Sequence, residues 1–199
     1  MALDIVILGP PGAGKGTQAK RIAMEAGIPH IATGEMLRAA IAAGTELGKQ
    51  VKAVVERGDL VSDDLMIEVI RQRLAQPDTA NGFVLDGFPR TLAQAEALDR
   101  MLEETERGPL SVVLEFKIPE GLALQRLLER GHEEGRADDT PEVIRHRIAV
   151  QSVPEELVAY YRAKGILVGI HAERSVDEVF AEVQEVLQTV AARSEVPTR

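Results

Sequence analysis

The chain has 199 residues, 45% of them hydrophobic, with a formal net charge of −9 at pH 7 and no cysteine; this length fits one α/β domain that can bury a substantial core. The acidic balance argues against nucleic acid as the main partner, because binding a phosphate backbone requires a broad basic surface. The missing cysteines exclude disulfides, thiol chemistry and zinc sites built on cysteine.

The N-terminal residues carry no basic targeting region, and no apolar run is long enough to cross a bilayer. We therefore expect a cytoplasmic protein with no membrane and no nucleic acid among its partners.

The first expected strand runs directly into a glycine-rich loop. The pattern G-x-x-x-x-G-K matches at Gly9, Gly14 and Lys15, and a helical pattern follows. Loop amides and the positive end of a helix dipole together favour a bound polyanion, so we expect a phosphate-binding loop. Gly16 stands where such loops usually carry Ser or Thr, which indicates a metal held mostly by phosphates and water.

Helical patterns alternate with the remaining strands. Strands are predicted at Asp4–Leu8, Ile28–Ile31, Phe83–Asp86, Val112–Phe116 and Ile166–His171. This alternation indicates a doubly wound, five-stranded parallel sheet of the P-loop NTPase type, with its ligand site at the carboxyl ends of the strands.

Two segments fit the sheet poorly. Residues 33–61 are expected as short helical pieces broken by Gly34, Gly44, Gly48 and Gly58, and residues 130–139 form a polar excursion. Both can be ordinary surface loops or mobile flaps, because glycine ends and few apolar residues suit elements that open and close.

The third strand delivers Asp86 at its carboxyl end, beside the expected phosphate loop. A carboxylate there can orient a water on Mg²⁺, although it can also cap a helix. Arg90 begins a turn at the same edge, and Gln94 has the donor and acceptor groups needed to read the edge of a base.

Three helix starts carry capping patterns. Thr91-x-x-Gln94 and Ser175-x-x-Glu178 read as capping boxes, and Thr140-Pro141 reads as an N-cap followed by proline.

Four ordered motifs resemble those of the adenylate kinase family. They are GPPGAGKGTQ from Gly9, TGEMLR from Thr33, DGFPRT from Asp86 with Gln94 beyond it, and GRADD from Gly135. The similarity runs from Asp4 to about Val190, and the short polar excursion matches the family's short-lid form. It implies one P-loop kinase domain over residues 1–199, with a segment for the nucleoside monophosphate at 32–61 and a short lid at 129–139.

The resemblance implies a reversible, Mg²⁺-dependent phosphoryl transfer from ATP to AMP that gives two ADP. The catalytic residues implied are Lys15, Arg90, Arg130, Arg136 and Arg147. The ATP side would be Gly12, Ala13, Gly14, Lys15, Gly16, Thr17, Arg130, Arg136, Arg147 and the main chain near Arg174. The AMP side would be Thr33, Arg38, Asp59, Leu60, Val61, Gly87, Phe88, Pro89, Arg90 and Gln94.

Further expectations concern the metal and the surroundings of the site. Asp86 would hold Mg²⁺ indirectly, through water, and no zinc is expected. Arg126 lies four residues before Arg130 on one helix face and is expected to support the site. The resemblance suggests a monomer. The histidines show no metal spacing, and we interpret all of them as structural or surface residues: His30, His132, His146 and His171.

Three alternatives stay open. A kinase for UMP and CMP has similar motifs, but Gln94 and Thr33 favour AMP. A catalytically inactive regulator that binds ATP and AMP would not need arginines from both flaps, and a P-loop ATPase motor is disfavoured by Gly16. Residues 150–156 depart from the family, which usually has a Tyr and a Thr-x-Pro pattern there.

Overall fold

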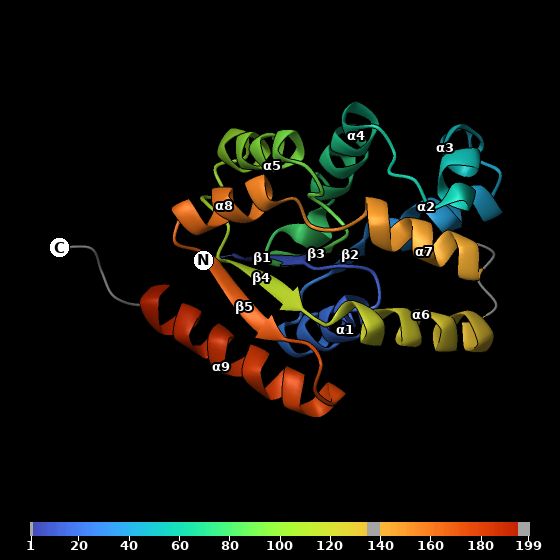
Figure 1. Cartoon of the computed structure of the whole chain (residues 1–199). Helices are drawn as coiled ribbons and strands as arrows, with labels where there is room; N and C mark the ends of the chain where they lie inside the picture. The colour runs from blue at the N-terminus through green and yellow to red at the C-terminus, as the bar shows by residue number, and fades with distance from the viewer. Residues whose placement is uncertain (1, 135–139, 195–199) are drawn as a thin grey trace.

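The computed structural model describes residues 2–134 and 140–194, and its centre is a parallel sheet of five strands (Figure 1). The spatial order is β2-β3-β1-β4-β5, and each neighbouring pair is parallel. The strands are β1 Leu3–Leu8, β2 His30–Ala32, β3 Gly82–Asp86, β4 Val112–Lys117 and β5 Leu167–His171. The predicted α/β fold and five-stranded parallel sheet are therefore confirmed.

One strand start is wrong by two residues. β2 begins at His30 and not at Ile28. Pro29 has no N–H to donate to a ladder, so the strand starts only after it. The Pro29 carbonyl still accepts a hydrogen bond from the Val84 N–H at 2.9 Å.

Helices cover both faces of the sheet, with α5 and α8 above it and α9 below it in Figure 1. Their bounds are α1 Lys15–Ala26, α2 Thr33–Ala42, α3 Glu46–Arg57, α4 Asp63–Leu74, α5 Leu92–Glu104, α6 Glu120–Glu134, α7 Pro141–Val150, α8 Glu155–Ala163 and α9 Val176–Ser194, with a 3₁₀ turn at Pro77–Thr79.

The side chains of β1 alternate between the two faces of the sheet, and the core forms one layer on each face. Ile5 and Ile7 pack with side chains of α1 and α9, whereas Val6 and Leu8 pack with those of α4, α5 and α8. Successive strand side chains point to opposite faces, so a run that is apolar throughout predicts a strand buried on both sides. All four of these side chains are 3% exposed or less.

Residues 33–61 form two full helices, α2 and α3, beside the main body (Figure 1). The expectation that Gly34 and Gly48 break them is wrong, because both lie inside helices; Gly44 and Gly58 do stand at helix ends. A Cβ on Gly48 would overlap the Ala40 carbonyl of α2, so this glycine allows close packing of α3 on α2.

The polar excursion after Arg130 is also more helical than expected. α6 continues to Glu134, so Arg130 lies on a helix, as its spacing from Arg126 predicts, and the first residues of the excursion are helical too. Residues 135–139, with Arg136 and the GRADD motif, lie outside the described residues.

The three capping patterns are found at helix starts. Ser175 and Glu178 form the complete reciprocal box, and Thr140 accepts from the Val143 N–H at 3.4 Å. Thr91 accepts from the Gln94 N–H at 3.2 Å, but Gln94 does not reach back to Thr91. Its carbonyl oxygen instead accepts from the N–H of Arg90, at 2.7 Å.

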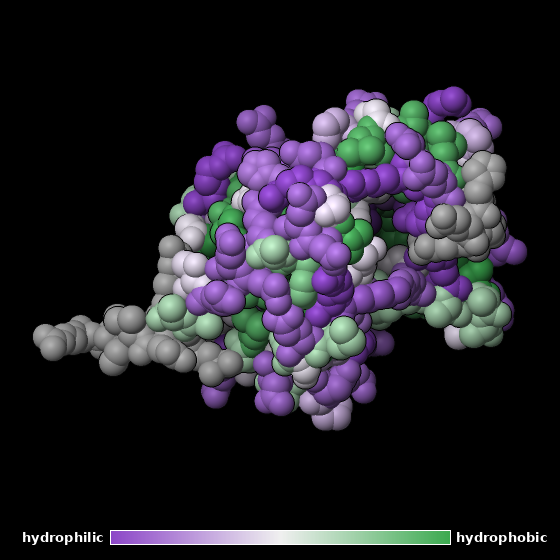
Figure 2. Space-filling view, turned by 90° about the horizontal axis from the view of Figure 1, so that it is seen from below, coloured by the Kyte–Doolittle hydropathy of each residue, from purple (hydrophilic) through white to green (hydrophobic). Residues whose placement is uncertain are grey.

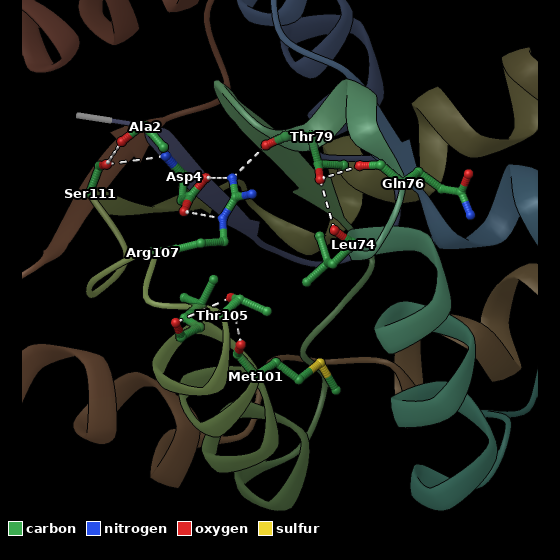
Figure 3. Close-up of polar contacts among 10 residues, drawn as sticks. Ala2, Asp4, Leu74, Gln76, Thr79, Met101, Thr105, Arg107 and Ser111 are labelled. Atoms are coloured by element: carbon green, nitrogen blue, oxygen red, sulfur yellow. Dashed lines mark hydrogen bonds and ion pairs between the residues drawn. The ribbon is translucent and has the colours of Figure 1, made fainter.

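A buried ion pair closes the amino end of the sheet, opposite the strand ends that carry the predicted site (Figure 3). Asp4 is 1% exposed and accepts from the Arg107 guanidinium at 2.8 and 3.2 Å, while its N–H donates to the Ser111 hydroxyl at 3.1 Å. Arg107 also donates to the Thr79 carbonyl. These bonds join β1 to the segments that precede β3 and β4.

The face seen from below is mostly hydrophilic, with apolar side chains in small patches (Figure 2). Across residues 2–134 and 140–194, no helix combines the length and the apolar character needed to traverse a membrane.

Candidate active site

A cleft of about 520 Å³, here called the phosphate cleft, lies where β1 and β3 end and α1 begins. Helix α1 starts at Lys15, and its N-cap residue, Gly14, makes no side-chain cap bond. The first helical N–H groups are thus available to an anion. A Cβ on Gly12 would lie 2.5 Å from the Ala123 carbonyl, so the loop can lie directly against α6 only with glycine there.

Most residues that sequence reasoning assigned to ATP line this cleft, namely Gly12, Ala13, Gly14, Lys15, Gly16, Thr17, Arg130, Arg147 and Arg174. Asp86, expected to hold Mg²⁺ through water, and Arg90, expected on the AMP side, line it as well.

Lys15 is held inside the loop, since its Nζ donates to the Gly9 and Pro10 carbonyls, each at 2.8 Å. Burial lowers its pKa to about 8; Asp86 opposes this shift, and Arg90, Arg147 and Arg130 add to it. A cation that is desolvated and surrounded by like charges gains most from a polyanion placed next to it.

Asp86 faces the same cleft from the end of β3. Burial acts to raise the pKa of its carboxyl, but His30, Lys15 and Arg90 outweigh burial and hold that pKa below its ordinary value. His30 Nε2 lies 3.6 Å from Asp86 Oδ2. A Cβ on Gly16 would lie 3.4 Å from that oxygen, so an ionised carboxylate flanks the first turn of α1. This donor fits a Mg²⁺ ion held through water.

A second space of about 80 Å³, here called the flap cavity, lies against α2 and the segment after α3. The residues assigned to AMP that line it are Thr33, Arg38, Asp59, Leu60, Val61, Gly87, Arg90 and Gln94, together with Arg147.

The two spaces meet at a common wall. The residues that line both are Gly34, Arg38, Gly87, Arg90, Arg147 and Gln151. Three of these six are arginines, so the junction between the spaces is strongly basic.

Arg90 is fixed at this junction by two hydrogen bonds. Its Nε donates to the Gly87 carbonyl at 2.9 Å, and its Nη1 donates to Gln151 Oε1 at 3.1 Å. Burial lowers the pKa of Arg90; Asp86 opposes that shift and Arg147 reinforces it.

Several predicted residues occupy other positions. Phe88 is 1% exposed in the core, and Pro89, joined to it by a cis peptide bond, lines a small third space that Lys15 also lines. Arg174 does line the phosphate cleft, and its side chain pairs with Glu182.

Gln94 reaches the flap cavity but is already engaged. It is 3% exposed, its oxygen accepts from the Arg90 N–H, and its Nε2 donates to Asp63 at 2.8 Å. A primary amide has two donor hydrogens and two acceptor lone pairs, so one of each remains for a base.

The support expected from Arg126 has a definite form. Arg126 Nη1 donates to the Ala172 carbonyl at 2.8 Å, and Nη2 lies 3.3 Å from the Arg174 carbonyl. Arg126 thereby secures the loop between β5 and α9 against α6.

Sequence reasoning missed Gln151 and the position of His30 beside Asp86. The strand register pairs Ala32 with Asp86, and His30 is two residues before Ala32 on the same face of β2, a signal that could have placed it. Gln151 gave no signal, because it follows α7 in a segment that matches no motif.

His146 and His171 pair with Asp59 and Glu182 on the surface.

Within the described residues, no group of three or more His, Cys, Asp or Glu side chains is placed to hold a metal. A Mg²⁺ at Asp86 would therefore need phosphate and water for its other ligands, as Gly16 indicates.

The chain is similar to curated proteins along almost all of its length. The family model described as adenylate kinase matches residues 7–166. The adenylate kinase of Stenotrophomonas maltophilia strain K279a is 47% identical over 91% of this chain and 97% of its own length. The adenylate kinase of Thermus thermophilus is 48% identical over 92% and 96%, and that of Caulobacter vibrioides is 46% identical over 96% and 100%. The chain therefore belongs to the adenylate kinase family.

Proposed function

We propose that this chain transfers a phosphoryl group reversibly from ATP to AMP, giving two ADP. The observation that carries the proposal is the basic wall shared by the phosphate cleft and the flap cavity. A donor triphosphate in the first space and a monophosphate acceptor in the second would face each other across Arg90 and Arg147. Membership of the adenylate kinase family supports the choice of the two nucleotides.

Phosphoryl transfer requires little covalent chemistry from a protein, and mainly needs in-line positioning and positive charge. Lys15 and the first turn of α1 would hold the triphosphate, with Arg130 and Arg136 on the lid side. Arg38 would hold the AMP phosphate, and Arg90 and Arg147 would neutralise charge on the migrating group. The lowered pKa values of Lys15 and Arg90 support this assignment, because burial desolvates both cations and neighbouring arginines add to the shift.

The AMP base would lie in the flap cavity, where Leu60 and Val61 offer apolar contact and Gln94 a polar one. The ATP base would lie by the loop that Arg126 secures, with Arg174 contributing its main chain.

Mg²⁺ bound with ATP would neutralise charge on the β- and γ-phosphates, and Asp86 would hold it through water. Because Asp86 is ionised and beside the first turn of α1, it can orient such a water without direct ligation.

Water must be excluded, since a transfer site open to solvent would hydrolyse ATP. We propose that residues 32–61 and 129–139 act as the two flaps of a single domain over residues 1–199. α2 and α3 support the first flap, because they pack on each other beside the main body (Figure 1). We further propose a monomeric cytoplasmic enzyme.

The test is ADP formation from ATP and each of AMP, UMP, CMP and GMP, with and without Mg²⁺. We expect AMP to be the preferred acceptor and the reaction to stop without Mg²⁺. A clear preference for a pyrimidine nucleotide would favour UMP/CMP kinase activity, and binding without ADP formation would favour an inactive regulator.

A further inference from the structure

Gln151 lies where the end of α7 meets the phosphate cleft and the flap cavity. It follows the last residue of α7, and its N–H donates to the Arg147 carbonyl at 2.8 Å. Its side chain is 9% exposed and lines both the phosphate cleft and the flap cavity. A polar side chain buried at a junction of two spaces needs partners of its own.

Both ends of the Gln151 amide have partners. Oε1 accepts from Arg90 Nη1 at 3.1 Å, and Nε2 donates to the Gly58 carbonyl at 2.6 Å. Arg90 is the predicted transfer arginine, and Gly58 is the residue that ends α3 of the first flap. We call this pair of hydrogen bonds the Gln151 clamp.

The flap end is packed against α7 as well as bonded to it. Gly58 is buried, and a Cβ there would overlap the Arg147 side chain. Next to it, Asp59 Oδ1 lies 2.6 Å from His146 Nε2 on the same helix. The end of α3 is thus packed against α7 and bonded to it. Within this contact, Gln151 is the residue that also binds Arg90.

We propose that Gln151 is a positioning residue that couples the end of the flap to the orientation of Arg90. When the Gly58 carbonyl lies on α7, the amide is oriented by Nε2 and presents Oε1 to Arg90. If the flap end moved away, the amide would lose that orientation and Arg90 would lose one of its two fixed contacts. The proposal rests on the reaction proposed above.

The chemistry of an amide suits this role. It supplies one donor and one acceptor from the same group, so a single side chain can bind a carbonyl and a guanidinium together. It is also neutral, so Arg90 keeps its full charge for the migrating phosphoryl group. A carboxylate would repel the Gly58 carbonyl and neutralise Arg90.

The test compares Gln151→Met, Gln151→Glu and the parent chain by steady-state kinetics with AMP and ATP varied separately. For Gln151→Met we expect kcat to fall about tenfold, on the scale of a lost hydrogen bond to a charged group. KM for AMP should rise a fewfold, because Gly58 lines the AMP side, while KM for ATP stays unchanged. Gln151→Glu should lower kcat further than Gln151→Met.

The matched control is Gln72→Met on α4, where an exposed glutamine donates to Glu68 at 2.8 Å, outside the proposed site. It should leave all three constants unchanged.

Coupling to Arg90 is the decisive measurement. In an Arg90→Met background, adding Gln151→Met should lower kcat less than twofold, because the partner that Gln151 orients is already gone. A further tenfold loss there, or equal rises in both KM values, would overturn the proposal. If Gln151→Met does not fold, Gln151→Glu carries the same cycle. A parent chain that forms no ADP would reject the proposed function instead.

Discussion

Replacing Arg90 with methionine tests the proposed transfer mechanism separately from folding. The guanidinium has five N–H donors. One is used on the Gly87 carbonyl and one on Gln151, so three remain for phosphoryl oxygens. Methionine fills much of the same volume but offers none of them.

The magnitude follows from those remaining donors. Arginine fingers contribute roughly 10³-fold or more to phosphoryl transfer, which is about 4 kcal/mol of activation free energy. We expect Arg90→Met to lower kcat by about 10³-fold. Arg90→Lys should lose about 10²-fold, because one ammonium keeps the charge but cannot maintain the forked geometry.

The stability of the folded protein should change little in the Arg90→Met variant. Burial and Arg147 both lower the pKa of Arg90, which means that the folded protein disfavours the charge that catalysis needs. Removing it relieves that cost and offsets the two lost hydrogen bonds. We expect the melting temperature of Arg90→Met to stay within about 3 °C of the parent.

The assay is ADP formation under saturating ATP and AMP, run beside thermal unfolding of the same samples. Loss of activity with unchanged melting supports direct action on the transferred group. A variant that keeps more than a tenth of the parent kcat would refute the reasoning, as would a loss of activity that simply follows unfolding.

Three further predictions concern other parts of the molecule. Because Lys15 has a pKa of about 8 in the nucleotide-free protein, ATP binding should weaken about tenfold between pH 7 and pH 9 as Lys15 of the free protein loses its proton; calorimetry should show this, whereas Lys15→Arg should lack that lysine-linked step. Asp86→Asn should raise the Mg²⁺ concentration needed for half-maximal rate about 10- to 100-fold, the usual effect of losing an outer-shell partner, and an unchanged Mg²⁺ titration would contradict its assigned role. Arg107→Met should lower the free energy of unfolding by about 3–5 kcal/mol by leaving buried Asp4 unpaired, seen as a large drop in melting temperature without a change in kcat at 25 °C.

The fold was predictable because its signals are local. The run Ile5–Leu8 is apolar throughout, which indicates a strand covered on both sides, and the structure buries all of it. Glycines were harder to interpret, since one that ends a helix and one that lets two helices approach look alike in sequence. For that reason the sequence predicts a break at Gly48, whereas in the structure this glycine allows α3 to pack closely on α2.

The candidate site was predictable where a motif carries the chemistry by itself. Lys15, Asp86 and Arg90 each follow a strand or begin a helix, so their common edge of the sheet follows from topology. Gln151 could not be found that way. Its importance depends on two partners, Gly58 and Arg90, that lie 93 and 61 positions away in the chain. Only the packing of α7 against the flap brings them together.

Buried charges are arranged differently at the two ends of the sheet. At the amino end, Asp4 and Arg107 neutralise each other in a buried pair, and the pair joins segments of the core. At the carboxyl end, burial and neighbouring arginines lower the pKa of both Lys15 and Arg90, and Asp86 only partly opposes this. Desolvated positive charge favours a polyanion that enters the site, because the polyanion supplies negative charge next to the buried Lys15 and Arg90. This explains why Arg90 is held by neutral partners, the Gly87 carbonyl and the Gln151 amide: a carboxylate in their place would cancel the charge that the reaction uses.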